Sequence, residues 1–173
     1  HPTAELFING KSYGKQSKNN SSLKNRYRLM WMDAVYEPGE IKVVAYNKDG
    51  KAVAEKIVRT AGKPHHIELV SNRNELTADG KDLAYITVKV VDKDGNLCPA
   101  DSRQINFSVK GAGKYRAAAN GDPTNLEQFH LPKMHAFNGM LTAIIQAGET
   151  AGEIVFTAKA NGVKAGNIRI QTK

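Results

Sequence analysis

Two β-rich segments meet at VRTAGKP, residues 58–64. Short strand-like segments precede this stretch, and a second and longer series of them follows it. Gly62 permits backbone angles that other residues avoid, and Pro64 has no amide proton to donate to a sheet. The stretch therefore predicts a short, fairly stiff linker between two β-domains, which we place at residues 1–62 and 63–173.

The composition is that of a folded protein without a membrane-spanning segment. Of the 173 residues, 40% are hydrophobic, which is enough to form cores of ordinary size. No apolar run reaches the ~18 residues that a spanning helix needs. The single cysteine, Cys98, cannot form an intrachain disulfide, and we interpret it as a small apolar residue. Because the sequence starts at His1 and not at Met, we expect it to be part of a longer chain.

The net charge of +8 lies mainly in the first 62 residues, where 11 basic and 6 acidic residues give +5. Six basic residues and no acidic residue occur between Leu6 and Met32. Such a stretch could face nucleic acid, another polyanion or an acidic neighbouring protein. Its charges are scattered among Asn and Ser and are not clustered with aromatic residues. A solvated loop and strand face is therefore favoured, and no nucleic-acid partner is predicted.

Alternating apolar residues predict several short strands in the first segment. The pattern AELFI (residues 4–8) leads into Asn9-Gly10, a pair typical of a tight hairpin, and residues 11–15 form the return strand. Two further strands are predicted at residues 41–46 and 52–59, joined by a second glycine-containing turn.

A row of larger side chains is predicted to fill the core of this first segment. Tyr27, Leu29 and Trp31 occupy alternate positions, the spacing of residues that share one face of a strand. We therefore expect Trp31 to be buried together with Tyr27 and Leu29. An exposed Trp31 would instead suit a platform for binding sugars.

The second segment repeats this pattern at greater length. Inward-facing rows are predicted at Ala84, Ile86, Val88 and Val90; at Ile105, Phe107 and Val109; at Leu141, Ala143 and Ile145; and at Ile154, Phe156 and Ala158. Residues 110–135, rich in Gly, Asn and Pro, are expected to be irregular. No window keeps a 3.6-residue period, so helix should be minor. The predicted fold class is all-β, with two tandem immunoglobulin-like β-sandwich domains.

The first segment resembles a small β-sandwich found after the catalytic barrel in β-galactosidase-like members of glycoside hydrolase family 2. The resemblance rests on AELFINGKSYGK (4–15), Trp31 and YEPGEIKVVAYNKDGKAVAEKIVRTAGKP (36–64). It implies one more strand before the hairpin, so residues 1–62 would be a partial sandwich with an open sheet edge. We expect this module to be the less stable of the two, with its N-terminal hairpin the most mobile strand pair.

The second segment resembles the immunoglobulin-like C-terminal domain of the same enzymes. The stretches that carry this resemblance are LTADGKDLAYITVKVVDKDGNL (76–97), NGDPT (120–124) and AFNGMLTAIIQ (136–146). The first of these is also similar to the repeats of invasin-type bacterial adhesins. The other two favour the hydrolase.

No catalytic residue is predicted in this chain. Retaining glycosidases need two carboxyl groups about 5 Å apart, one of them kept protonated. The resemblance implies that both lie in the barrel, which would precede His1. Glu5, Glu37 and Glu40 sit beside turns and are interpreted as solvent-facing carboxylates.

Neither a metal site nor a cofactor is predicted. DKDGN (residues 92–96) begins like a calcium loop but lacks the Gly and Glu that such a loop needs, so it predicts a hairpin turn. His65 and His66 are adjacent, and on a strand they would face opposite ways. His130 and His135 have no third ligand nearby in the sequence.

The candidates for an interaction site are Asn120, Gly121 and Asp122. Asn and Asp in such a turn commonly bond to their own backbone, which fixes the loop. Long loops at the end of a sandwich are also where binding residues gather. The sequence leaves both interpretations open.

The resemblance implies that the chain is a non-catalytic accessory part of a β-galactosidase-type hydrolase. Its partners would be the catalytic barrel and other domains of the parent enzyme, with a glycan as a further candidate. The alternatives are a carbohydrate-binding module and an adhesin stalk repeat. The resemblance also implies a bacterial protein located in the periplasm or outside the cell.

Overall fold

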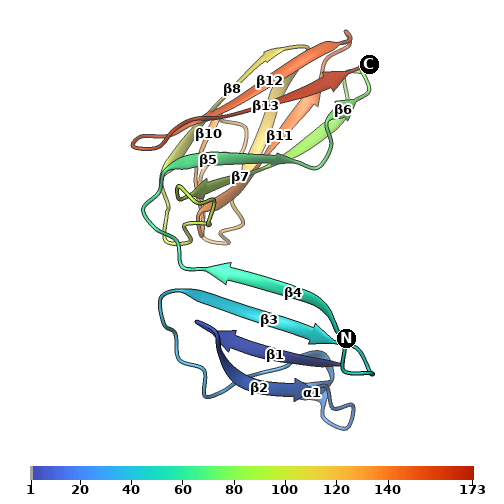
Figure 1. The fold of residues 1–173 in the computed structure, drawn as a ribbon. Helices are drawn as coiled ribbons and strands as arrows, with labels where there is room; N and C mark the ends of the chain where they lie inside the picture. Colours follow the sequence, from blue (N-terminus) through green and yellow to red (C-terminus); the bar gives the residue numbers. More distant parts are fainter. Residues whose placement is uncertain (1) are drawn as a thin grey trace. The chain divides into compact units, whose positions relative to one another are not determined.

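The computed structural model describes residues 2–173 and divides after Thr60 into two compact units. We call the part up to Thr60 unit 1 and Ala61–Lys173 unit 2. Regular structure in both units is almost entirely β-strand (Figure 1), so the predicted all-β fold class is confirmed. The one described helix, α1 (Leu23–Tyr27), has five residues. Over residues 2–173, no helix is long and apolar enough to cross a membrane.

Unit 1 contains one antiparallel sheet in the order β2-β1-β3-β4. Its strands are β1 (Thr3–Ile8), β2 (Lys11–Ser17), β3 (Glu40–Tyr46) and β4 (Ala52–Arg59). The β1–β2 hairpin turns at Asn9 and Gly10, whose φ angles of 49° and 81° are the positive values that this residue pair predicts. No second sheet occurs in the described part of unit 1, where the sequence predicts a small partial sandwich.

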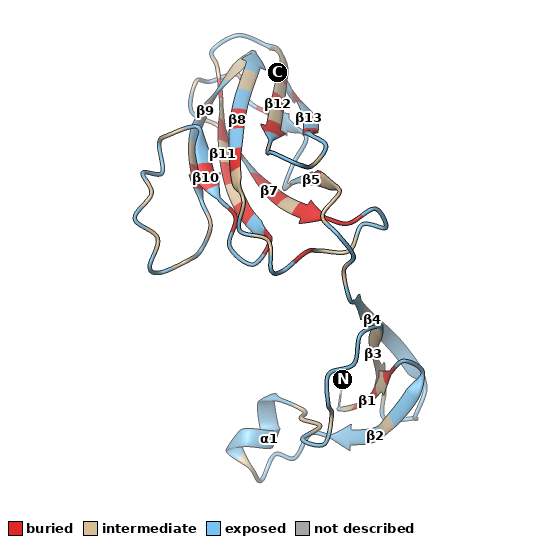
Figure 2. Cartoon of the chain, turned by 90° about the vertical axis from the view of Figure 1, so that its left-hand side faces the viewer, coloured by how far each residue is buried: buried red, intermediate tan, exposed pale blue. Residues whose placement is uncertain are grey.

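The central strand β1 supplies the buried residues of unit 1. Ala4, Leu6 and Ile8 point to the same face of the sheet and are all buried (Figure 2). Because β1 pairs with both β2 and β3, it is not an edge strand. The open sheet edge expected for this module therefore does not lie on β1. The unpaired edges of this sheet belong to β2 and β4.

The predicted core row of Tyr27, Leu29 and Trp31 is also wrong. Ser22 caps helix α1 by accepting a hydrogen bond from the backbone N–H of Asn25 at 3.3 Å, so Tyr27 ends a helical turn and is 73% exposed. Trp31 is half-buried outside any strand, and its indole Nε1 donates to the carbonyl oxygen of Gly14 at 2.8 Å. Three alternating positions cannot form a strand without a neighbouring strand to bond, and this segment pairs with none of the described strands.

Unit 2 is a sandwich of two sheets. One sheet has the order β5-β7-β11-β9 and the other β10-β8-β12-β13-β6. The strands are β5 (His66–Ser71), β6 (Glu75–Leu76), β7 (Leu83–Val91), β8 (Gln104–Gly111), β9 (Gly113–Ala119), β10 (Lys133–His135), β11 (Met140–Ala147), β12 (Gly152–Lys159) and β13 (Gly166–Thr172).

The core of unit 2 lies between these sheets and follows the alternation of the sequence. All but one of the residues predicted to face inward on β7, β8, β11 and β12 are buried, and Val109 is partly buried against the same core. Phe156 is fully buried and stacks on Phe107, with ring centroids 5.7 Å apart. Cys98 is buried in this cluster as the predicted apolar residue.

The region from residue 110 to residue 135 is more regular than predicted. Strand β9 occupies residues 113–119, and β10 occupies residues 133–135. The sequence GKYRAAA is a weak strand signal, since only Ala118 is fully buried and Lys114, Arg116 and Ala119 are exposed. Pairing with β11 makes it a strand, and that pairing cannot be read from local propensity.

Asp92 anchors the start of unit 2 to the β7–β8 turn. Its carboxylate accepts hydrogen bonds from the backbone N–H of Gly62, Asp94 and Asn96 at 2.8–2.9 Å. The predicted hairpin turn at residues 92–96 is present. The Asp92 carboxylate that opens it accepts hydrogen bonds from amides of the protein itself. These bonds fix the position of Gly62 relative to the sandwich of unit 2.

Candidate functional site

The predicted interaction residues lie in a long loop that joins β9 to β10. Asn120 accepts a hydrogen bond from the Asp122 backbone N–H at 3.0 Å and donates from Nδ2 to the His135 carbonyl oxygen, also at 3.0 Å. One carboxylate oxygen of Asp122, Oδ1, accepts hydrogen bonds from the backbone N–H and the hydroxyl of Thr124 at 2.9 and 2.8 Å. Gly121 has a φ of 81° and supplies the turn itself. The loop-fixing role of these side chains is therefore present.

A second pair of side chains, Glu127 and His135, ties the far end of the loop to β10. Glu127 accepts the backbone N–H of His135 and contacts its ring Nδ1, both at 3.0 Å. Burial alone would raise the pKa of the Glu127 carboxyl, but these bonds and the charge of His135 hold it below its usual value. Glu127 is therefore ionised at neutral pH and can only accept hydrogen bonds.

These groups surround a cavity of about 500 Å³, which we call the loop cavity. It is lined by Ser102, Asn120, Asp122, Thr124, Asn125, Leu126, Glu127, His135, Ala136 and Phe137. Two of the three predicted residues line it, while Gly121 only shapes the turn. Glu127 is not among the residues predicted from the sequence, and His135 is weighed there only as a metal ligand. No local pattern brings these two residues together, because seven residues (128–134) lie between them.

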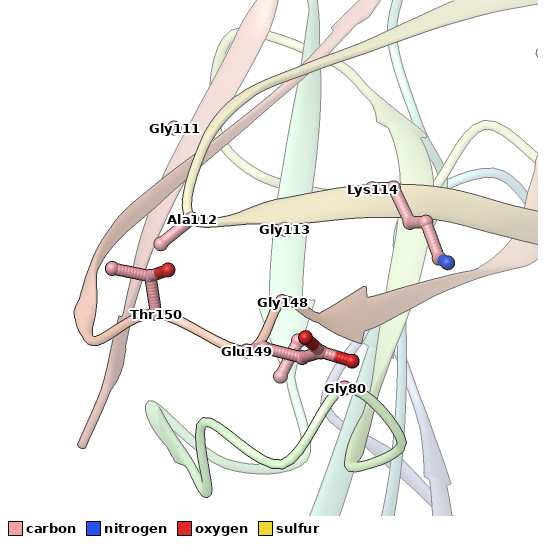
Figure 3. A pocket seen from close by; sticks show the side chains of 9 residues that line it. Gly80, Gly111, Ala112, Gly113, Lys114, Gly148, Glu149 and Thr150 are labelled. Atoms are coloured by element: carbon pink, nitrogen blue, oxygen red, sulfur yellow. The ribbon is translucent and has the colours of Figure 1, made fainter.

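Another cavity, of about 460 Å³, lies where the β8–β9 and β11–β12 connections meet (Figure 3). Its wall is mostly glycine and alanine backbone, with Lys114, Glu149 and Thr150 as the longer side chains. Gly111 and Gly148 allow this close approach of chains, since a Cβ at Gly111 would lie 1.9 Å from the Glu153 carbonyl oxygen. The cavity offers few side-chain groups for catalysis or recognition.

The carboxylates of unit 1 take part in local bonds. Glu5 accepts hydrogen bonds from Ser12 at 2.7 Å and from the Tyr46 hydroxyl at 2.8 Å, and these two bonds lower the pKa of its carboxyl. Glu40 forms a 2.7 Å ion pair with Arg59 on the neighbouring strand. Glu5 and Glu40 are half-buried, so the interpretation as simple solvent-facing groups holds only for Glu37.

The two adjacent histidines do not face opposite ways. Their Nδ1 atoms lie 3.0 Å apart and their rings meet edge to face. The alternation rule fails because β5 begins at His66, which leaves His65 in the irregular segment before the strand. Between Pro2 and Lys173, no three His, Cys, Asp or Glu side chains are grouped so that they could hold a metal ion.

The fold and these sites define a class of protein: β-modules with an immunoglobulin-like sandwich, whose polar side chains serve mainly to fix turns and loops. Comparison with known families identifies the class further. Residues 67–169 match the model of the glycoside hydrolase family 2 C-terminal domain 5, and residues 1–54 match a domain of unknown function, DUF4982. The chain belongs to glycoside hydrolase family 2 through this C-terminal domain.

Similar proteins include bacterial β-galactosidases. The chain is 41% identical over 169 residues to β-galactosidase BoGH2A of Bacteroides ovatus, covering 98% of this chain and 19% of that protein. It is 32% identical over 126 residues to a β-galactosidase of Thermoanaerobacter pseudethanolicus, covering 72% of this chain and 15% of that protein. A crystal structure of a family 2 member from Bacteroides cellulosilyticus matches with a TM-score of 0.85 and 34% identity, over 99% of this chain and 22% of the other. The chain thus spans about a fifth of the length of these relatives.

Proposed function

We propose that this chain is a non-catalytic accessory part of a bacterial β-galactosidase-type hydrolase of family 2. The observation that carries the proposal is the match along 98% of the chain to a β-galactosidase of which it spans only 19%. The carboxylates described above support it, because Glu5, Glu40, Asp92 and Glu127 are all engaged in bonds that hold turns, loops or strands. The adhesin alternative rests on residues 76–97 alone and is less well supported.

The two outer faces of the unit 2 sandwich support a role in packing against other domains. Two neighbouring rows on the outside of the β5-β7-β11-β9 sheet are uncharged, with Ala117, Ile144 and Tyr85 in one and Ala119, Thr142, Thr87 and Val70 in the next, and we call these two rows the uncharged face. The row beyond them holds Met140 and the Lys89–Glu68 ion pair. The face of the other sheet is polar and charged, with Lys110, Val155 and Arg169 in one row and Ser108, Thr157 and Asn167 in the next. An uncharged face that exposes 45% of Tyr85 is typical of a surface covered by a partner. The partner we propose is another domain of the same polypeptide.

The first test is catalytic. The purified 173-residue chain should give no hydrolysis of a chromogenic β-galactoside above a buffer blank, while the longer protein that contains it should hydrolyse the substrate. Turnover by the chain alone, in a preparation from a host lacking β-galactosidase, would contradict the accessory role.

The packing role has its own test, Tyr85→Lys. In the isolated chain this substitution at an exposed position should leave the melting temperature nearly unchanged. In the longer protein the same change should lower it, because a charge would be buried at a domain contact. Ser108→Lys, on the polar outer face, is the matched control and should be neutral in both. Equal behaviour of the two variants in the longer protein would show that the uncharged face is not covered.

We extend the proposal to location. The relatives named above are bacterial. We propose that the protein containing this chain lies in the periplasm or outside the cell, where it could reach external glycans. Fractionation of the source bacterium, followed with an antibody to this chain, would test this. Recovery with the cytoplasmic fraction would contradict it.

A further inference from the structure

We propose that the loop cavity binds a terminal neutral hexopyranose of a glycan. The proposal goes beyond the accessory role, since it gives unit 2 a ligand of its own. The argument for a sugar rests on the side chains that line the cavity. Only the choice of a galactoside as the first probe rests on the proposed function. A sugar ring needs hydrogen-bonding groups for its hydroxyls and an apolar surface for its C–H face, and the loop cavity offers both.

The first observation is a buried donor without an acceptor. The side-chain nitrogen of Asn125, Nδ2, is shielded from solvent and has no hydrogen-bond partner among the described residues. The Asn125 side chain helps to lower the pKa of the Glu127 carboxyl, but no hydrogen bond of acceptable geometry joins Nδ2 to that carboxyl. A buried amide without a partner is costly, so such a group is commonly satisfied by a water molecule or a ligand hydroxyl.

Two polar atoms of residues that line the cavity are free of bonds within the loop. Thr124 occupies Oδ1 of Asp122, and the second oxygen, Oδ2, accepts no hydrogen bond from the described residues. His135 contacts the ionised Glu127 through Nδ1, and because a carboxylate can only accept, Nδ1 must carry the proton. This contact leaves Nε2, the other ring nitrogen, free to hydrogen-bond a ligand hydroxyl. The Asp122 oxygen and this ring nitrogen can therefore each bond one hydroxyl group of a sugar.

Apolar groups complete the site. Phe137 lines the loop cavity and is 38% exposed, so part of its ring faces solvent and can contact the C–H face of a sugar. Leu126, which also lines the cavity, is 96% exposed and adds a second apolar surface. A concave site with a few directed polar groups and an exposed aromatic ring is the ordinary form of a small-ligand site.

The wall is held in place without a ligand. Asn120 and Glu127 both bond the backbone of His135, which joins the two sides of the cavity. Behind them the Tyr115 hydroxyl donates to the carbonyl oxygens of Phe129 and Leu131 at 3.1 and 2.8 Å. Binding therefore costs little ordering of the loop. The cavity of Figure 3 lacks such side-chain groups and carries no similar proposal.

The charges of the wall indicate a neutral sugar. Asp122 and Glu127 are acidic, and neither Lys nor Arg lines the loop cavity. A uronic acid would bring its own carboxylate toward these two groups and would be repelled. We therefore expect a hexoside to bind and the corresponding glucuronide to bind more weakly.

The test is a titration of the ¹⁵N-labelled chain with methyl β-D-galactopyranoside, followed by amide chemical shifts. We expect a Kd on the order of 1 mM, with shifts confined to residues 120–127 and 135–137. Methyl β-D-glucopyranoside serves as a second neutral hexoside, and methyl β-D-glucuronide as the charged comparison. Shifts that are absent for both neutral sugars, or that map outside the loop cavity, would overturn the proposal, and so would equal affinity for the glucuronide.

Asp122→Asn separates recognition from folding. An Asn at this position keeps the oxygen that bonds Thr124 but replaces the free oxygen with a donor, so the loop should fold while affinity falls about tenfold. Asp94→Asn, at an exposed turn, removes the same charge elsewhere and should leave the Kd unchanged. Phe137→Ala should weaken binding independently. Unaltered binding by both loop-cavity variants would overturn the site even if the longer protein proves to be a β-galactosidase.

Discussion

At the scale of single residues, Asp92 shows how a charge can hold a domain start in place. Its side chain is 3% exposed, and it accepts bonds from the Asn96 side-chain amide, the Gly62 backbone and the backbone of the turn. These bonds, led by the one from the Asn96 side chain, hold the pKa of Asp92 far below its usual value despite its burial. The ionised form is therefore the one that stabilises the fold.

Asp92→Asn should consequently destabilise unit 2 in a pH-dependent way. The folded-state pKa lies below the unfolded-state value of about 3.9, so the stabilisation is fully present above that pH and is lost as pH falls below it. Wild type should melt well above the variant at pH 7, and the gap should narrow below about pH 4. Asp94→Asn in the same turn serves as the control, and melting curves at several pH values provide the measurement. A gap that is constant with pH would show that the carboxylate charge is not what stabilises the turn.

The candidate site was predictable only in part at this scale. Asn120, Gly121 and Asp122 could be selected because turn chemistry is local: each acts on backbone within a few residues. The Glu127–His135 pair depends on closure of the intervening loop, and the unpartnered amide of Asn125 depends on burial. Neither closure nor burial of a single atom is encoded in a short pattern.

At the scale of elements, alternation predicted the strands that are buried on one face, such as β7 and β11. It failed where a strand is defined by its neighbours. Strand β9 has only one fully buried residue, Ala118, and forms by pairing with β11. Conversely, residues 27–31 alternate but have no pairing strand, and the helical turn capped by Ser22 ends at Tyr27. The alternation of apolar and polar residues can be read from a short stretch of sequence, whereas the pairing of strands depends on residues far apart in the chain.

The crossing from β8 to β9 gives an element-scale prediction for Gly111→Ala. The chain leaves one sheet for the other here, Gly111 has a φ of 89°, and an added Cβ would lie 1.9 Å from the Glu153 carbonyl oxygen. Backbone strain alone should cost roughly 1–2 kcal/mol, and the clash should add to it. Gly95→Ala is the matched control, because Gly95 has a φ of 83° but open space around its Cβ position.

Urea denaturation of both variants would measure the difference. We expect Gly111→Ala to be clearly the less stable of the two, since both share the left-handed backbone and only one has the clash. Equal loss of stability would mean that the β12 backbone moves aside without cost, and the close contact would then not constrain the crossing.

At the scale of the whole molecule, the two units differ greatly in buried core. Over the described residues, the buried apolar side chains of unit 1 are Ala4, Leu6 and Ile8, all from one strand. Unit 2 buries a cluster of twenty residues from both of its sheets. Stability grows with buried apolar area, so a unit with one sheet and a small core should unfold more readily than a complete sandwich.

Hydrogen exchange can test this difference with matched strands. Strand β1 lies between β2 and β3, and β7 lies between β5 and β11, so each is a central strand paired on both sides. Any difference in their protection then reports the stability of the unit and not the position of the strand in its sheet. We expect amides at Glu5–Ile8 to exchange faster than those at Ile86–Val90, with β2 and β4 faster than β1 within unit 1. Equal or greater protection of β1 would show that its small core and surrounding loops suffice for a fully stable unit, and the ranking by buried area would fail.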